Sequence, residues 1–178
     1  MFGYAGKIAK IDLNKKSIED FPVSQSEREM YLGGKTLAAK IIYDSFSAKI
    51  EAFSPENIIV ITSGPLSGSS SPCSSRFNIS TISPLTGLLV SSNCGGNFGL
   101  YLKRAGYDGL IIGGKSEERV FIDVSENNIS ILSAEGLWGK NTYETQTLLG
   151  DDKRGKLVIG PAGENLVRFA AVMSQERA

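Results

Sequence analysis

Two stretches of this sequence predict β-hairpins of the same form. Lys7-Ile-Ala-Lys-Ile-Asp-Leu13 alternates apolar and polar residues, continues into the polar segment Asn14-Lys-Lys-Ser17, and returns as Ile18-Glu-Asp-Phe21. Arg119-Val-Phe-Ile-Asp-Val124, Ser125-Glu-Asn-Asn128 and Ile129-Ser-Ile-Leu132 repeat that order. Alternation with a period of two is the signal of a strand with one buried face, and a short polar segment between two such runs favours a hairpin turn.

The elements after each hairpin also match in order. Each hairpin precedes a helical segment, a buried strand that ends in Gly-Pro, and an Arg-Phe strand. In the first half these elements are Gln25 to Phe46 with a break at Gly33-Gly34, Ile58 to Gly64, and the strand from Arg76-Phe77. In the second half they are Thr142 to Leu149, Leu157 to Gly160, and the strand from Arg168-Phe169.

We interpret this order as an internal duplication over about residues 3–82 and 107–178. The alternative is coincidence in a glycine-rich chain. Three further elements are expected between the repeats: a strand over Leu88 to Ser92, a helix over Phe98 to Arg104, and a strand over Tyr107 to Gly113. The predicted fold is α+β and strand-dominated, a duplicated hairpin–helix–strand unit that forms two packed sheets with two or three helices. Residues 1–178 are expected to form a single domain.

Composition excludes several classes of function. The chain has 178 residues, with 19 Lys plus Arg against 19 Asp plus Glu, so it has no net charge to favour nucleic acid or an anionic membrane. Its apolar runs are too short to span a bilayer, and the N-terminus lacks the pattern of a secretory signal, so we expect a cytoplasmic protein. There is no histidine and there are two cysteines, Cys73 and Cys94. The chain is therefore expected to contribute binding rather than proton transfer or metal ligation.

Two features could bind an anion. Asn93-Cys-Gly-Gly-Asn-Phe-Gly99 joins a predicted strand to a predicted helix, and its glycines would let backbone N–H groups approach a phosphate. Arg76 begins a strand after a run of small residues, and a guanidinium offers a fixed fork of donors to phosphate oxygens. From the residues alone, an ordinary strand-to-helix turn and a solvent-facing arginine are favoured over a ligand site.

A set of motifs in one order carries a resemblance to a known family. The chain resembles the N-terminal domain of the tungsten-containing aldehyde:ferredoxin oxidoreductase family from Gly3 to Ala178. The motifs that carry it are Gly64-Pro-Leu-Ser-Gly68, Arg76-Phe-Asn78, Ser83-Pro-Leu-Thr-Gly87, Asn93-Cys-Gly-Gly96 with Phe98-Gly99, Ala105-Gly-Tyr-Asp108, Trp138-Gly139 and Ile159-Gly-Pro-Ala-Gly-Glu-Asn165. Each motif is short, and the ordered series is specific. Ser74 and Ser75 depart from the glycines that the family often has there, and Cys94 replaces a more usual small residue.

The resemblance implies a function that extends beyond this chain. Family members hold tungsten, sometimes molybdenum, through two pterins, carry a 4Fe-4S cluster, oxidise aldehydes to carboxylic acids and pass the electrons to ferredoxin. By resemblance, Arg76, Asn93, Gly95, Arg177 and Ala178 contact the pterin cofactor. The cluster ligands and catalytic residues would lie in downstream domains, so the 178-residue chain alone is expected to be inactive. An apolar face where those domains would pack predicts a tendency to dimerise.

Two other functions fit the same residues. A member of the family could act on another carbonyl compound or an aromatic thioester. A non-catalytic binding or assembly module could also have kept the fold and the phosphate-binding loop.

Overall fold

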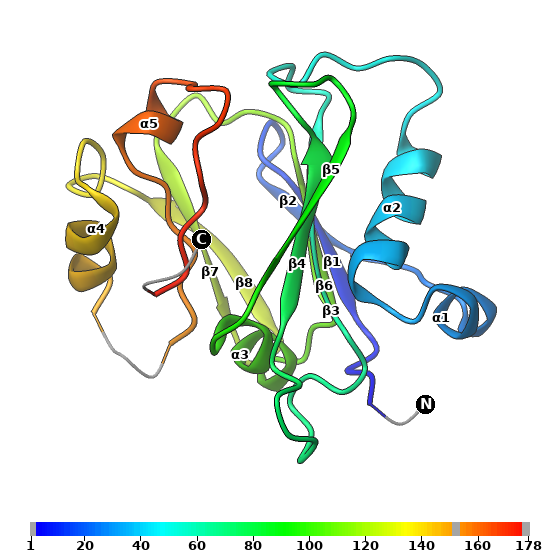
Figure 1. The fold of residues 1–178 in the computed structure, drawn as a ribbon. Coiled ribbons are helices and arrows are strands. Elements are labelled where there is room, and N and C mark those ends of the chain that lie inside the picture. The colour runs from blue at the N-terminus through cyan, green and yellow to red at the C-terminus, as the bar shows by residue number, and fades with distance from the viewer. Residues whose placement is uncertain (1–2, 151–153, 176–178) are drawn as a thin grey trace.

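A computed structural model describes residues 3–150 and 154–175 of the chain, which form two sheets with helices on both sides (Figure 1). The order along the main sheet is β2-β1-β6-β3-β4-β5, and β7 and β8 form a second sheet. The main-sheet strands are β1 (Ile8–Asp12), β2 (Ser17–Phe21), β3 (Ile58–Ser63), β4 (Phe77–Ile82), β5 (Leu89–Cys94) and β6 (Gly109–Gly113). The second sheet contains β7 (Val120–Ser125) and β8 (Asn128–Ser133). The predicted strand-dominated α+β fold with two packed sheets is confirmed.

The main sheet combines antiparallel pairs with one parallel pair. Both predicted hairpins are present, as β1–β2 with Ile11 opposite Ile18 and as β7–β8 with Ile122 opposite Ile131. β6 lies between β1 and β3, parallel to β1 and antiparallel to β3. β6 therefore joins the sheet of the first half of the chain, although the predicted repeat places its residues in the second half.

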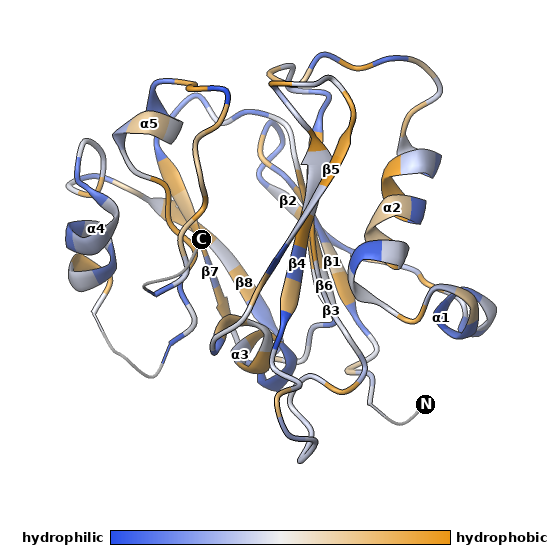
Figure 2. Ribbon diagram, viewed as in Figure 1, coloured by the Kyte–Doolittle hydropathy of each residue, from blue (hydrophilic) through white to orange (hydrophobic). Residues whose placement is uncertain are grey.

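Strand alternation gives the main sheet two buried faces. Ile8, Val60 and Ile111 point to one face and pack against α2 (Gly34–Ser45). The neighbouring residues on the same strands point to the other face, where they meet α3 (Phe98–Arg104) and the β7–β8 sheet; these residues are Ala9, Ile11, Ile61 and Leu110. Figure 2 shows hydrophobic residues along the strands of both sheets and hydrophilic residues on α1 and α4. Each face thus has its own hydrophobic core.

The predicted helix from Gln25 to Phe46 is divided where the glycines occur. α1 spans Gln25–Tyr31 and α2 spans Gly34–Ser45. Ser24 begins α1 with a capping box, in which its side chain accepts from the N–H of Glu27 and the Glu27 carboxylate accepts from the N–H of Ser24. Gly33 has a φ of 155°, and a Cβ there would lie 2.6 Å from the Ser63 carbonyl oxygen. The break therefore lets the start of α2 approach the end of β3.

The second half has less strand structure than predicted. Leu157 to Gly160 and Arg168 to Val172 are not strands; an isolated bridge joins Val158 to Met173. The predicted helix at Thr142 is present as α4 (Thr142–Leu148). Pro161 begins an unpredicted short helix, α5 (Pro161–Glu164), as expected for a proline at the first helical position. With α1 and α2 separate, the described residues contain five helices rather than two or three.

Helix length bears on membrane insertion. α2, with 12 residues, is the longest helix in residues 3–150 and 154–175, and none in these ranges has the length and apolar character of a membrane span.

Candidate functional site

Arg76 lies at one end of the main sheet, immediately before β4. Its side chain is exposed and its Nη2 donates to the carbonyl oxygen of Asn93, at 3.4 Å, across the β4–β5 pair. The long distance marks a weak bond. A guanidinium carries five N–H donors, so most of the donors of Arg76 have no partner within residues 3–150 and 154–175.

Asn93 and Gly95 lie beside Arg76. Asn93 is exposed on β5, opposite Asn78 of β4, and Cys94 is opposite Phe77. A Cβ placed on Gly95 would lie 3.7 Å from Nη1 of Arg76. The structure therefore brings together three of the five residues predicted to contact a cofactor. The other two, Arg177 and Ala178, lie outside the described residues.

The turn after β5 presents unpaired backbone donors. The N–H groups of Gly95, Gly96 and Asn97 make no hydrogen bond to any other part of residues 3–150 and 154–175. Gly96 has a φ of 96°, whereas Asn97 has right-handed helical angles, and such a change of hand between neighbours can aim successive N–H groups at one anion. Together with the Arg76 fork, the turn offers positive charge and oriented donors to an oxyanion.

A buried polar network fixes β4 against β5 next to this site. Asn78 is 1% exposed and donates to the Ser80 hydroxyl at 2.8 Å, while its side-chain oxygen accepts from Ser91 at 2.7 Å. The Ser80 and Ser91 hydroxyls are 3.0 Å apart. All the members of this network have partners, so it stabilises the strand pair that carries Arg76 and Asn93. In the sequence Asn78 stands out only as part of a motif, because its partner Ser91 comes from the neighbouring strand β5.

The two cysteines are far from forming a cluster site. Cys94 is buried in the core and Cys73 is exposed in the loop before β4. In the described ranges, there is no group of three or more His, Cys, Asp or Glu residues placed to hold a metal ion.

A buried charged cluster that the sequence does not predict surrounds Asp108, immediately before β6. Its carboxylate accepts from Nη1 of Arg28 at 2.9 Å, from Lys103, and from the N–H groups of Ala5 and Gly6. Burial alone raises the pKa of Asp108, but the hydrogen bonds from Lys103 and the two N–H groups outweigh it, so the pKa lies below its ordinary value. The cluster joins the N-terminal segment to α1 and α3. No local pattern predicts it, because its members are far apart in the sequence.

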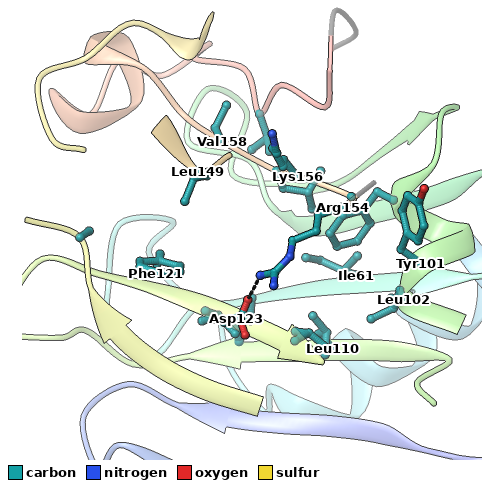
Figure 3. A pocket seen from close by; sticks show the side chains of 18 of the residues that line it. Ile61, Tyr101, Leu102, Leu110, Phe121, Asp123, Leu149, Arg154, Lys156 and Val158 are labelled. Atoms are coloured by element: carbon teal, nitrogen blue, oxygen red, sulfur yellow. Dashed lines mark hydrogen bonds and ion pairs between the residues drawn. The ribbon is translucent and has the colours of Figure 1, made fainter. Parts of the chain in front are cut away.

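A cavity of about 760 Å³ lies between the β7–β8 sheet and α3 (Figure 3). Most of its wall is apolar and includes Ile61, Leu102, Leu110, Phe121, Leu149 and Val158. Arg154 and Asp123 form an ion pair in the wall, with 3.2 Å between Nη1 and Oδ1. Arg76, Asn93 and Gly95 are not among the described residues that line it, so the cavity and the anion site are separate features.

Comparison with known proteins gives one consistent result. A family model described as the N-terminal domain of aldehyde ferredoxin oxidoreductase matches residues 8–178. The tungsten-containing aldehyde ferredoxin oxidoreductase of Pyrococcus horikoshii is 40% identical over 178 residues, which are 98% of this chain and 29% of that protein. The WOR-like subunit of an aliphatic sulfonate oxidoreductase from Pyrococcus furiosus is 32% identical over 194 residues, covering 98% of this chain and 31% of that subunit.

Comparison with solved structures agrees with the sequence comparisons. The active site complex BamBC of benzoyl coenzyme A reductase, solved with 1,5-dienoyl-CoA, contains a chain with a TM-score of 0.93 and 36% identity. The match covers 97% of the present chain and 27% of that chain. The present chain thus spans under a third of the length of these similar proteins.

Proposed function

The chain belongs to the aldehyde ferredoxin oxidoreductase family, whose N-terminal domain it matches, and on this premise we propose that it forms one wall of the pocket for a tungsten bis-pterin cofactor. The tungsten-containing relatives favour tungsten over molybdenum as the metal. In the proposed pocket Arg76, Asn93 and Gly95, with Arg177 and Ala178 from the C-terminal end, contact the pterin cofactor.

One observation carries this proposal: Arg76 and the N–H groups of Gly95 to Asn97 lie at the same end of the sheet, with donors that have no partner in the described part of the chain. Phosphate oxygens are the ligands that such a set of donors fits best. A phosphorylated pterin would therefore be held by its phosphate, with the exposed Asn93 amide available as a further polar contact. These residues therefore fit the phosphorylated pterin that the family implies.

In the longer protein, the bound metal–pterin group would supply the redox chemistry by which an aldehyde is oxidised to a carboxylic acid. The role of the present chain would be to bind and orient the pterin. Ferredoxin would receive the electrons through a 4Fe-4S cluster whose ligands lie in downstream domains, and a homodimer is a further proposal. The 178-residue chain by itself would not oxidise aldehydes, which a dye-linked assay of the purified chain can check.

The proposal is tested by replacing Arg76 in the polypeptide that contains this domain. Arg76→Ala removes the guanidinium fork and is expected to lower the tungsten and pterin content per polypeptide by about tenfold, because a charge-assisted hydrogen bond contributes about 1.5–3 kcal/mol. The matched control is Arg168→Ala, since Arg168 is also exposed and also precedes a phenylalanine. Metal analysis and fluorescence of the oxidised pterin give the readout. Full cofactor content in Arg76→Ala, or an equal loss in Arg168→Ala, would contradict the proposal.

A second reaction within the family has support from the comparisons. The benzoyl coenzyme A reductase complex and the aliphatic sulfonate oxidoreductase subunit show that proteins similar to this chain include ones named for other substrates. The alternative is therefore a subunit that acts on an aromatic thioester or another carbonyl compound. Assays of the longer protein with an aliphatic aldehyde and with an aromatic thioester separate the two reactions.

A further inference from the structure

The loop between β3 and β4, residues 64–76, is held by a buried hydroxyl. Ser67 is 5% exposed, and its Oγ lies 3.0 Å from the carbonyl oxygen of Ser74 and 3.0 Å from that of Arg76. The single hydroxyl proton is shared between these two acceptors. Ser67 itself lies in a turn, because its N–H donates to the Gly64 carbonyl. The hydroxyl therefore connects the start of the loop to the residue from which the Arg76 side chain projects.

A second hydroxyl connects this loop to the turn after β5. Ser75 Oγ donates to the carbonyl oxygen of Gly96 at 2.7 Å. Ser75 immediately precedes Arg76, and Gly96 is one of the residues with an unpaired N–H. The bond therefore connects the residue before Arg76 to the turn that carries the backbone donors. The Ser75 hydroxyl thus has a structural role in this chain.

The start of α3 completes the support beneath Arg76. Gly99 is buried, and a Cβ there would lie 3.2 Å from the Arg76 carbonyl oxygen, the same atom that accepts from Ser67. The absence of a side chain at Gly99 lets α3 approach this carbonyl closely. The backbone of Arg76 is therefore held from two sides, while its side chain stays exposed.

We propose that Ser67 and Ser75 are positioning residues for the anion site: Ser67 holds the backbone of Arg76, and Ser75 holds the turn of Gly96 beside it. This rests on the proposed function, because it assigns the two hydroxyls to the same phosphate-binding site. A site whose donors are held in place before binding loses less conformational entropy when the ligand binds. Neither serine touches the ligand in this arrangement.

The experiment measures binding of inorganic phosphate to the 178-residue chain. Amide and arginine side-chain NMR signals of Gly95, Gly96 and Arg76 report occupancy during a phosphate titration. Ser67→Ala and Ser75→Ala are each expected to raise the dissociation constant by about threefold to tenfold, the worth of one hydrogen bond. Ser67→Cys keeps a weak donor of similar size and is expected to lie between Ser67→Ala and the wild type. Ser69→Ala is the matched control, because Ser69 is in the same loop but is exposed and bonds to the nearby Leu66 carbonyl.

A double-mutant cycle separates positioning from general stability. If Ser67 acts through Arg76, Ser67→Ala has little further effect on phosphate binding in an Arg76→Ala background. Weaker binding confined to the Ser67 and Ser75 variants, with this coupling, supports the proposal. Phosphate binding that is unchanged in Ser67→Ala and Ser75→Ala, while the wild type binds at Gly95 and Gly96, overturns positioning and leaves the site itself intact. A wild-type chain whose signals do not respond to phosphate overturns both.

Discussion

At the scale of single residues, Asp108 makes the densest set of polar contacts described in this fold. Its side chain is 4% exposed, and its cationic partners Arg28 and Lys103 are 11% and 8% exposed at their side chains. Arg28 and Lys103 also bond to the carbonyls of Gly6 and Gly3, so the N-terminal segment depends on the same three charges. Removing the Asp108 carboxylate would leave both cations buried without a counter-charge.

Asp108→Asn is therefore predicted to destabilise the chain strongly. Loss of the carboxylate leaves two buried cations, and breaking a buried ion pair in this way costs about 3–5 kcal/mol. Urea unfolding at neutral pH measures the change in the free energy of unfolding. Asp44→Asn serves as the control, because the Asp44 side chain is 51% exposed and pairs with Lys40 at the surface. The control is expected to change stability by less than about 1 kcal/mol.

The pH dependence of this difference follows from the lowered pKa of Asp108. A carboxylate whose pKa is lower in the folded than in the unfolded chain stabilises the fold fully above its ordinary pKa of 3.8. The contribution is lost as the pH falls through the lowered pKa of the folded state. The difference in the free energy of unfolding between the wild type and Asp108→Asn should thus be constant near neutral pH and shrink below pH 3.8. A difference that grows on acidification would show that the pKa of Asp108 is raised in the folded chain instead.

Two Arg-Phe pairs differ in how deeply the phenylalanine is buried. The sequence predicts strands from both Arg76-Phe77 and Arg168-Phe169, yet Phe77 is 2% exposed and Phe169 is 81% exposed. Phe77 lies on a strand with β3 on one side and β5 on the other, and its ring packs 4.9 Å from that of Phe98. The second pair has no such neighbours among the described residues. Burial here is decided by contacts distant in sequence, which a local motif does not contain.

At the scale of elements, the helix boundaries were the most predictable feature. The break at Gly33-Gly34, the end of α3 at Arg104 and the start of α4 at Thr142 were all expected from local residues. Local signals suffice because caps form within one turn of the helix. α4 follows this rule, since Asn141 accepts from the N–H of Glu144 at 2.9 Å and Glu144 accepts from the N–H of Asn141 at 3.2 Å.

Asn141→Ala is predicted to lower the free energy of unfolding by about 1 kcal/mol, because the N–H of Glu144 loses its side-chain acceptor at the start of α4. Thr147→Ala in the same helix is the control. Thr147 is exposed, its hydroxyl donates to the Tyr143 carbonyl in the preceding turn, and alanine is the better helix former. Thermal or urea unfolding should show the control unchanged or slightly more stable. Equal losses in both variants would mean that the cap does not stabilise α4.

Strands were predicted less well than helices, for a physical reason. The apolar run Leu157 to Gly160 has the composition of a buried strand, but Val158 makes an isolated bridge with Met173 instead of joining a sheet. A strand forms only where a neighbouring strand provides donors and acceptors for its backbone hydrogen bonds. For the same reason the sequence predicts β6 but not its position between β1 and β3. The sequence names Arg76, Asn93 and Gly95 as candidate site residues, and the structure places them side by side. Ser67 and the Asp108 cluster, in contrast, depend on contacts that appear only in the folded chain.

At the scale of the whole molecule, the two faces of the main sheet are covered by different elements. One face is covered by α2, and the other by α3 and the β7–β8 sheet (Figure 1). The turn of the β7–β8 hairpin is tied to the end of α3, where the N–H of Asn127 donates to the Ala105 carbonyl at 2.9 Å. β7 and β8 otherwise pair only with each other in the described ranges, and the cavity of about 760 Å³ lies beside them.

This asymmetry predicts unequal local stability, which native-state hydrogen exchange measures. Amides of β3 and β6 have a strand on both sides and a core on both faces, so they should exchange only through global unfolding. Amides of β7 and β8 should open with a free energy on the order of 2 kcal/mol lower, because a two-stranded sheet is marginal without further packing.

A matched pair of core variants locates the cause of this difference. Ile129 packs the second sheet onto the main sheet, and Ile111 packs the main sheet onto α2; both are buried. Ile129→Ala should therefore speed exchange in β7 and β8 more than in β3, whereas Ile111→Ala should lower protection in β3 and β6 at least as much as in β7 and β8. Uniform protection across both sheets in the wild type, or identical patterns in the two variants, would show that the sheets unfold as one cooperative unit.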